Sequence, residues 1–179
     1  HLKTKKIINF GTMMQHTNGK DFNSKNLYGS TKSAFEIILD YYNFKNRKLK
    51  LYNLKFYESF DENDKRKKLI PTLIKNYKKN EKTTVISKKL ELNLIHVKDI
   101  INAVNILLKN NLKSGTYCLK NVRNININNL IKNINKKSKK KKKIKFLDHK
   151  INKFNKNYFK ILPSWNSDKN IEQKVINQF

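Results

Sequence analysis

The stretch around which the rest of this chain is organised is Tyr28-Gly29-Ser30-Thr31-Lys32, followed directly by the run 33–42. This run predicts a helix that continues to about 43–46, and on a helix Tyr28 and Lys32 lie one turn apart on the same face. A neighbouring ammonium stabilises the phenolate form of a tyrosine, so the pair predicts a tyrosine that can act as an acid or base. The spacing alone is weak evidence, because it also arises by chance in a lysine-rich chain.

The composition is strongly basic. The 179 residues suffice for one domain with a core, and they carry 41 Lys+Arg against 13 Asp+Glu, a net charge of +28. Such a charge is typical of proteins that bind nucleic acid or anionic membranes. Arginine, however, which is favoured for recognising phosphates and bases, stands at only three positions, 47, 66 and 123. Asparagine and isoleucine are also inflated, so we attribute the charge mainly to codon bias and expect no nucleic-acid partner.

The chain has one cysteine, Cys118, so an intrachain disulfide is impossible and a reducing compartment is expected. No secretion signal and no apolar run of 18 residues is present. The sequence therefore predicts a cytoplasmic protein without a membrane span. The histidines and carboxylates are scattered without metal-ligand spacing, so no metal site is expected.

Strand-like and helix-like segments alternate, which predicts an α/β chain. The strands are expected near 5–10, 48–57, 83–86, 92–97, 115–119 and 144–146, and the helices near 28–43, 69–77, 99–108, 125–134 and 168–175. The lysine run 136–143 predicts a solvated, self-repelling loop, with a patch for anionic partners as the alternative.

Five segments, in this order and spacing, resemble the extended short-chain dehydrogenase/reductase family, which contains nucleotide-sugar epimerases, dehydratases and reductases. The strand Ile8-Asn9-Phe10-Gly11-Thr12 is similar to the family strand that ends in a catalytic Ser or Thr. The stretch 26–32 resembles the Pro-Tyr-Gly-x-(Ser/Thr)-Lys segment, with leucine in place of proline. The stretches 54–64, 91–100 and 115–119 resemble the family's Leu-Arg-x-x-(Asn/Asp)-x-Tyr-Gly-Pro, Arg-Asp-Phe-Ile-His-Val-Asp-Asp and Gly-x-Tyr-Asn segments.

The resemblance implies a mechanism. Tyr28 would be the acid/base for a sugar hydroxyl or ketone, Lys32 would assist Tyr28 and bind the nicotinamide ribose, and Thr12 would position the substrate oxygen. The cofactor would be NAD or NADP, and the substrate a nucleotide sugar. Glu58, in the third segment, and Lys68, in its continuation, are expected to contact the substrate. The acidic residue at Glu58 leans toward the branch with the CDP-abequose and CDP-paratose type reductases.

The resemblance also implies an architecture. The chain would contain a partial Rossmann-like parallel sheet with helices, and residues 1–60 would be the C-terminal part of the Rossmann-like cofactor domain with the helix that carries Tyr28 and Lys32. Residues 61–179 would be mainly a smaller substrate-binding α/β region, with the strand and helix near 92–110 returning to the cofactor domain. A homodimer through the tyrosine helix is expected, as in the family.

Two departures qualify the resemblance. The family begins with a glycine-rich turn that receives the cofactor's pyrophosphate, but the four glycines of this chain form no such cluster. We therefore expect that residues 1–179 alone do not bind NAD(P) tightly. In addition, Asp61-Glu62 replaces the family's Gly-Pro, although a residue with a Cβ is disfavoured wherever a turn needs a positive φ.

Other interpretations of the same residues remain open. Tyr28 could be a half-buried helix tyrosine, and Thr12 a loop residue bonded to its own backbone. The whole chain could be a degenerate, non-catalytic relative that serves as a binding or scaffold protein. A basic nucleic-acid-binding module ranks last, because the chain lacks aromatic stacking platforms.

Overall fold

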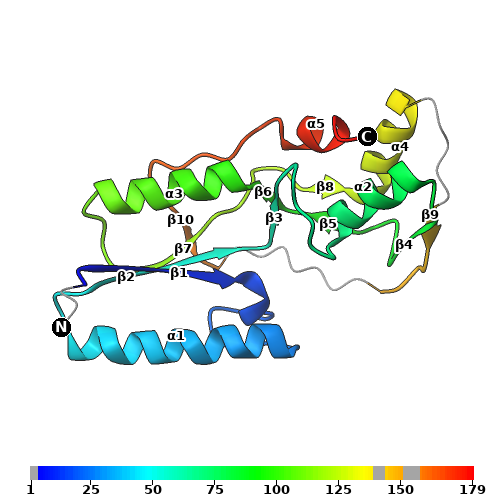
Figure 1. Ribbon diagram of the computed structural model, residues 1–179. Helices are drawn as coiled ribbons and strands as arrows, with labels where there is room; N and C mark the ends of the chain where they lie inside the picture. Colours follow the sequence, from blue (N-terminus) through cyan, green and yellow to red (C-terminus); the bar gives the residue numbers. More distant parts are fainter. Residues whose placement is uncertain (1–3, 139–143, 151–157) are drawn as a thin grey trace. The chain divides into compact units, whose positions relative to one another are not determined.

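The computed structural model describes residues 4–138, 144–150 and 158–179 and divides into two compact units (Figure 1). The first unit takes in His1–Tyr57, Lys98–Lys120 and Phe154–Ser167, and the second takes in Glu58–Val97, Asn121–Lys153 and Asp168–Phe179. The sequence analysis returned only the region near 92–110 to the first part of the chain. In the structure the helix of that region lies in the first unit, whereas its strand, up to Val97, lies in the second; the continuation to Lys120 and the segment 154–167 belong to the first unit as well, because both supply strands to its sheet.

The first unit is built on a parallel sheet of four strands in the order β1-β2-β7-β10. The strands are β1 (Lys6–Thr12), β2 (Lys50–Phe56), β7 (Gly115–Cys118) and β10 (Lys160–Ile161). The interior of β2 is buried throughout, as is typical of a parallel strand covered on both faces. The predicted α/β class with a Rossmann-like parallel sheet is thereby confirmed.

Two helices cover the sheet of the first unit. The helix α1 (Leu27–Lys45) packs on β1 and β2, and α3 (Val97–Lys109) lies on the opposite face (Figure 1). Lys6 of β1 ties the sheet to the C-terminal end of α3, because its ammonium donates to the carbonyl oxygens of Leu107 and Leu108 at 2.9 and 2.7 Å. A cation at this helix end also interacts favourably with the helix dipole.

Within its described residues, the second unit consists of three two-stranded pieces and three helices around an apolar core. β3 (Glu58–Phe60) pairs with β6 (Leu94–His96), β4 (Thr83–Val85) with β9 (Ile144–Phe146), and β5 (Glu91–Leu92) with β8 (Ile125–Asn126). The helices are α2 (Leu69–Lys79), α4 (Ile127–Ser138) and α5 (Ile171–Ile176). The core includes Phe60, Leu73, Leu130, Ile134 and Val175.

The structure differs from the sequence-based elements mainly in its short strands. The single strand expected at 92–97 is split at Asn93, whose side chain leaves the strand pattern and exchanges hydrogen bonds of 3.0 and 2.9 Å with the backbone of Asn121. The strands β8 and β10 have two residues each and carry no readable alternation of apolar and polar residues. Of the lysine run 136–143, residues 139–143 lie outside the described part of the chain.

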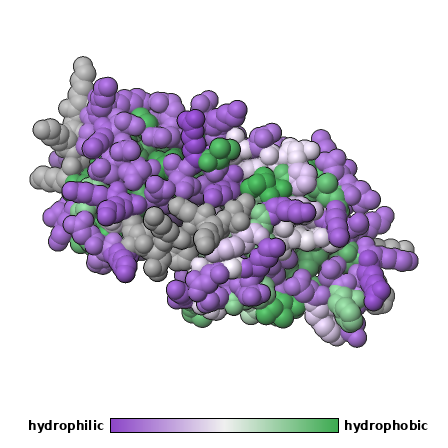
Figure 2. Space-filling model, turned by 180° about the vertical axis from the view of Figure 1, so that it is seen from behind, coloured by the Kyte–Doolittle hydropathy of each residue, from purple (hydrophilic) through white to green (hydrophobic). Residues whose placement is uncertain are grey.

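Hydrophilic side chains cover most of the face shown in Figure 2, with apolar patches between them. Among the described residues, no helix combines the length and the apolar composition that a membrane span needs. The single cysteine, Cys118, is fully buried, and burial raises the pKa of its thiol to about 11.

Candidate active site

The carboxyl end of β1 carries the first of the predicted catalytic residues, Thr12. This residue ends the strand and caps the short 3-10 helix η1 (Met13–Gln15), where its hydroxyl accepts a hydrogen bond from the Met14 N–H at 3.3 Å. Thr12 is only 4% exposed. The predicted strand ending in a hydroxyl residue is therefore present, and its threonine has a defined structural role.

The helix α1 begins next to η1. Its N-cap is Asn26, whose side-chain oxygen accepts a hydrogen bond of 2.7 Å from the N–H of Gly29, as N-cap residues do. A Cβ at Gly29 would lie 2.8 Å from the carbonyl oxygen of Met14, so the glycine permits the close approach of the helix to η1. The glycine of the Tyr-Gly-Ser-Thr-Lys stretch is thus explained by packing.

Tyr28 and Lys32 lie one turn apart on α1, as the sequence predicted. The ammonium of Lys32 donates to the carbonyl oxygen of Phe10 at 3.0 Å, which brings this side chain to β1 two residues before Thr12. Tyr28 is 55% exposed. The first unit thus holds all three predicted catalytic residues on two adjoining elements, the end of β1 and the first two turns of α1.

Three residues that the sequence analysis missed lie behind these. Lys55 of β2 is fully buried, and its ammonium forms an ion pair with Glu36 of α1. Gln15 of η1 joins the pair, since its amide donates to the Glu36 carboxylate at 2.8 Å. Burial lowers the pKa of Lys55, and the bond to Glu36 counteracts that effect. In the sequence, the one pattern that pointed to Glu36 was its position four residues, or one helical turn, after Lys32.

The two predicted substrate-binding residues, Glu58 and Lys68, both lie in the second unit, in β3 and at the N-cap of α2. Burial raises the pKa of the Glu58 carboxyl, and the nearby Lys68 ammonium counteracts it. Burial and the Arg66 guanidinium lower the pKa of Lys68, against the attraction of Glu58 and Asp64. The two side chains are therefore close enough to interact, and neither is fully solvated.

Arg66 adds a second charge at this end of α2. Its guanidinium donates to Asp64, at 2.8 Å from Nε to Oδ1, and to the Ser59 hydroxyl at 3.0 Å. In the sequence this arginine is one of only three, and no pattern around it pointed to these contacts.

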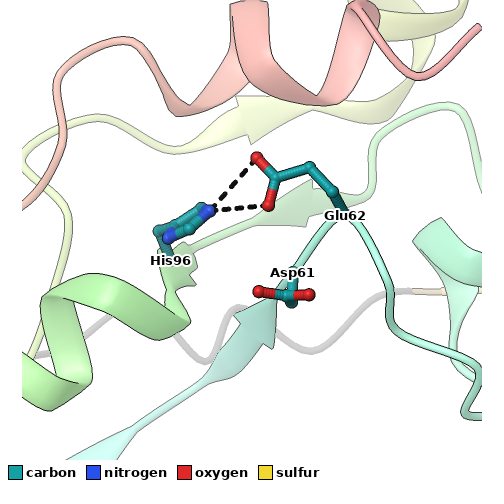
Figure 3. Close-up of side chains that lie close together, drawn as sticks. All are labelled: Asp61, Glu62 and His96. Carbon is teal, nitrogen blue, oxygen red and sulfur yellow. Dashed lines mark hydrogen bonds and ion pairs between the residues drawn. The ribbon is translucent and has the colours of Figure 1, made fainter.

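A further group in the second unit joins Asp61, Glu62 and His96 (Figure 3). Because β3 and β6 are parallel with Phe60 opposite His96, the residues that follow β3 come to lie beside the buried imidazole. His96 Nε2 lies 3.0 and 3.2 Å from the two carboxylate oxygens of Glu62, and the ligand atoms of all three side chains lie within 4.8 Å of one another.

No metal site was expected from the sequence, because His96 stands 34 residues after Glu62 and the grouping follows no local spacing. Carboxylates and imidazole are metal ligands in general. In this structure the imidazole and the Glu62 carboxylate form a hydrogen-bonded pair. Neither Asp61 nor Glu62 has a positive φ, so the replacement of Gly-Pro does not strain the backbone.

The parallel sheet with helices on both faces and a tyrosine–lysine helix beside the end of its first strand defines a Rossmann-like α/β class. The sequence model of the NAD dependent epimerase/dehydratase family matches residues 8–122, well over half of the chain. The chain belongs to this family.

Individual relatives agree with this assignment. Over 100 residues, 55% of this chain and 35% of the relative, the sequence is 32% identical to CDP-abequose synthase from Yersinia pseudotuberculosis. The fold matches UDP-N-acetylglucosamine 4-epimerase from Methanobrevibacter ruminantium M1 in complex with UDP-N-acetylmuramic acid, with a TM-score of 0.78 and 18% identity over 97% of this chain and 61% of that one. It also matches dTDP-glucose 4,6-dehydratase from Bacillus anthracis str. Ames in complex with NAD, with a TM-score of 0.78 and 17% identity over 97% of this chain and 60% of that one.

Other solved structures that match the fold are complexed with NAD or NADPH. The chain spans less than two thirds of the length of the relatives described above. The likeness to the solved structures, at under 25% identity, concerns the fold.

Proposed function

We propose that this chain is part of an NAD(P)-dependent nucleotide-sugar oxidoreductase of the epimerase/reductase type. The observation that carries the proposal is the contact between Lys32 Nζ and the Phe10 carbonyl oxygen, 3.0 Å, which holds the Tyr28–Lys32 helix at the end of the strand that carries Thr12. If the spacing of Tyr28 and Lys32 were a chance result of the lysine-rich composition, there would be no reason for Lys32 to lie at the end of β1.

In this proposal each residue has a chemical role that its surroundings permit. Tyr28 is 55% exposed, so its phenol can exchange a proton with a sugar hydroxyl or ketone. Lys32 places an ammonium one turn away on the same face of the helix. The Thr12 hydroxyl accepts from Met14 and still has its own hydrogen to donate to a substrate oxygen.

The cofactor would be NAD or NADP, which supplies or accepts the hydride when bound. Tyr28 and Lys32 fit a nicotinamide ribose, because a phenol and an ammonium are suitable hydrogen-bond partners for its hydroxyls. The glycines of the chain form no turn for the pyrophosphate. We therefore expect residues 1–179 to bind NADH weakly, which a fluorescence titration of the isolated chain measures. Tight stoichiometric binding would contradict this part of the proposal.

Glu58 and Lys68 are the proposed contacts to the substrate. The Lys68 ammonium only partly offsets the burial of Glu58, so the pKa of the Glu58 carboxyl stays raised. A sugar hydroxyl can donate to the carboxylate, and the ammonium suits a phosphate oxygen. The acidic residue at position 58 and the 32% identity to a CDP-abequose synthase favour a CDP-sugar among nucleotide sugars.

We also propose a homodimer through α1. This helix exposes several large apolar and aromatic side chains, which a second copy of the helix would cover. The side chains include Phe35 (50% exposed), Ile38 (51%), Tyr42 (57%) and Phe44 (68%). A cytoplasmic location, as expected from the single cysteine, belongs to the same proposal.

The test uses the intact protein with NAD(H) or NADP(H) and a panel of CDP-, UDP- and dTDP-hexoses and their 4-keto forms. Absorbance at the nicotinamide band and the sugar composition of the products report the reaction. Lys32→Met should abolish turnover, whereas Lys45→Met, at the far end of α1, should leave it unchanged. Absence of turnover on the whole panel would favour the degenerate, non-catalytic relative.

A further inference from the structure

A buried ion pair lies directly behind the proposed site. Lys55 of β2 is 0% exposed and Glu36 of α1 is 4% exposed, and their charged groups are in direct contact. Lys55 stands opposite Gly11 in the ladder between β1 and β2, and Gly11 is the residue before Thr12. The pair therefore connects α1 to the part of the sheet that carries the proposed threonine.

Gln15 links this ion pair to the backbone of Thr12. Its Nε2 donates to the Glu36 carboxylate at 2.8 Å, and its Oε1 accepts from the Thr12 N–H, also at 2.8 Å. An ionised carboxylate can only accept hydrogen bonds, so Glu36 requires the donating end of the Gln15 amide. The accepting end is thereby turned toward Thr12. The Glu36 carboxylate, paired with Lys55, therefore fixes which way the amide points.

The same ion pair fixes the helix. Tyr28, Lys32 and Glu36 follow one another at intervals of four residues and so share one face of α1. Glu36 anchors that face in the interior through Lys55, while the earlier turns bring Lys32 and Tyr28 to the end of β1. The contacts among Lys55, Glu36 and Gln15 therefore fix the position of the helix that carries Tyr28 and also the position of the Thr12 backbone.

We propose that Gln15 and Glu36, held in place by Lys55, are positioning residues that align Thr12 with the face of α1 that carries Tyr28 and Lys32. This inference rests on the proposed function. Its physical basis is that a catalytic group must be held within a fraction of an ångström, and that contacts behind the site supply this precision. None of the three residues needs to touch the substrate.

The informative substitution is Gln15→Met, which keeps the length of the side chain but removes both hydrogen bonds. The Glu36–Lys55 pair stays intact, so the chain should fold. Two readouts are used. One is hydrogen exchange of the Thr12 amide in the isolated chain, with the amide of Asn53 in β2 as an internal reference. The other is kcat and KM of the intact protein with NAD(P)H and the nucleotide sugar that it turns over.

The positioning role predicts that the Thr12 amide exchanges at least about tenfold faster and that kcat falls by about 100-fold, with KM for the cofactor unchanged. Gln173→Met, a matched substitution on α5, should alter neither readout. A Gln15→Met protein that keeps its kcat, or its Thr12 protection, would overturn the inference while leaving the proposed function standing. Absence of turnover in the unsubstituted protein would overturn both, whatever the exchange rates.

Discussion

Gly11 and Lys55 lie opposite each other in the ladder between β1 and β2, and the lysine side chain fills the space where a Cβ of residue 11 would be. Such a Cβ would come within 2.8 Å of both Lys55 Cδ and Gln15 Oε1. The contact shows how closely the buried polar groups pack against the end of β1.

Gly11→Ala should therefore destabilise the protein by about 1–3 kcal/mol, as overpacking does. Gly19→Ala is the control, because a Cβ there meets nothing within 4 Å, and it should change stability by no more than about 0.5 kcal/mol. Urea unfolding of both variants measures the difference. Equal stability of the two variants would show that the side chains of Gln15 and Lys55 can move aside and are not tightly packed against Gly11.

Breaking the Glu36–Lys55 pair on one side should be costly. Lys55→Met leaves the Glu36 carboxylate buried without its cation, and we expect a loss of about 3–5 kcal/mol in unfolding free energy. The double variant Glu36→Leu/Lys55→Met should lose clearly less than the sum of the two single variants. A double-mutant cycle by urea unfolding gives the coupling, and additive losses would contradict a direct charge pair.

Glu58 and Glu62 should respond to pH with opposite signs. Burial raises the pKa of Glu58 above its usual 4.5, so the protonated form of Glu58 contributes stability that is present below pH 4.5 and lost as the pH rises through the raised pKa. For Glu62, burial acts upward, but hydrogen bonds from its own backbone N–H and from His96 outweigh it and lower the pKa. Its stabilisation is present above pH 4.5 and lost as the pH falls through the lowered pKa.

Glu58→Gln should accordingly stabilise the protein at pH 7, on the order of 0.5 kcal/mol, and Glu62→Gln should destabilise it by about 0.5 kcal/mol. As the pH falls from 7 to 4, the Glu58 difference should disappear, because below pH 4.5 this carboxyl is protonated in both the folded and the unfolded chain, whereas the Glu62 difference should persist until the pH falls through the lowered pKa of Glu62. Denaturant unfolding between pH 4 and pH 7 checks this. Shifts of the same sign in both variants would contradict the assigned environments.

The proposed dimer makes a prediction about α1. Ile38→Glu should convert the dimer into a monomer, because a charge would enter the apolar contact. Ile86→Glu is the matched control, since Ile86 is exposed to a similar degree, 47% against 51%, but does not lie on α1. Sedimentation velocity at several concentrations distinguishes the two variants. A monomeric unsubstituted protein would refute the proposed interface.

Local patterns in the sequence were sufficient for the long elements. The apolar run before Gly11 predicted β1, and the run 33–42 predicted a helix that the structure confirms from Leu27 to Lys45. The strands β8 and β10 were missed because two residues carry no periodicity. The split at Asn93 depends on a hydrogen bond to a residue 28 positions away, which no local pattern reveals.

For the candidate site, the sequence predicted the residues that resemble the family's motifs. It did not reveal Gln15, Glu36 and Lys55, which contact one another behind these residues. The pairing of Lys55 with Glu36 depends on the register between β1 and β2 and on how α1 lies across them. Lys55 is one of many lysines in the sequence, and only its complete burial distinguishes it. The contact of His96 with Glu62 is likewise a consequence of the parallel pairing of β3 with β6.

The acid/base role of Tyr28 is the claim on which the rest depends, and the kinetics of two tyrosine variants test it. Tyr28 and Tyr41 lie on the same helix and are 55% and 57% exposed, so Phe at either position removes one hydroxyl from a similar environment. We predict that Tyr28→Phe lowers kcat of the intact protein by at least about 1,000-fold with the affinity for NAD(P)H nearly unchanged, and that Tyr41→Phe retains full turnover. Turnover that survives in Tyr28→Phe would contradict the account.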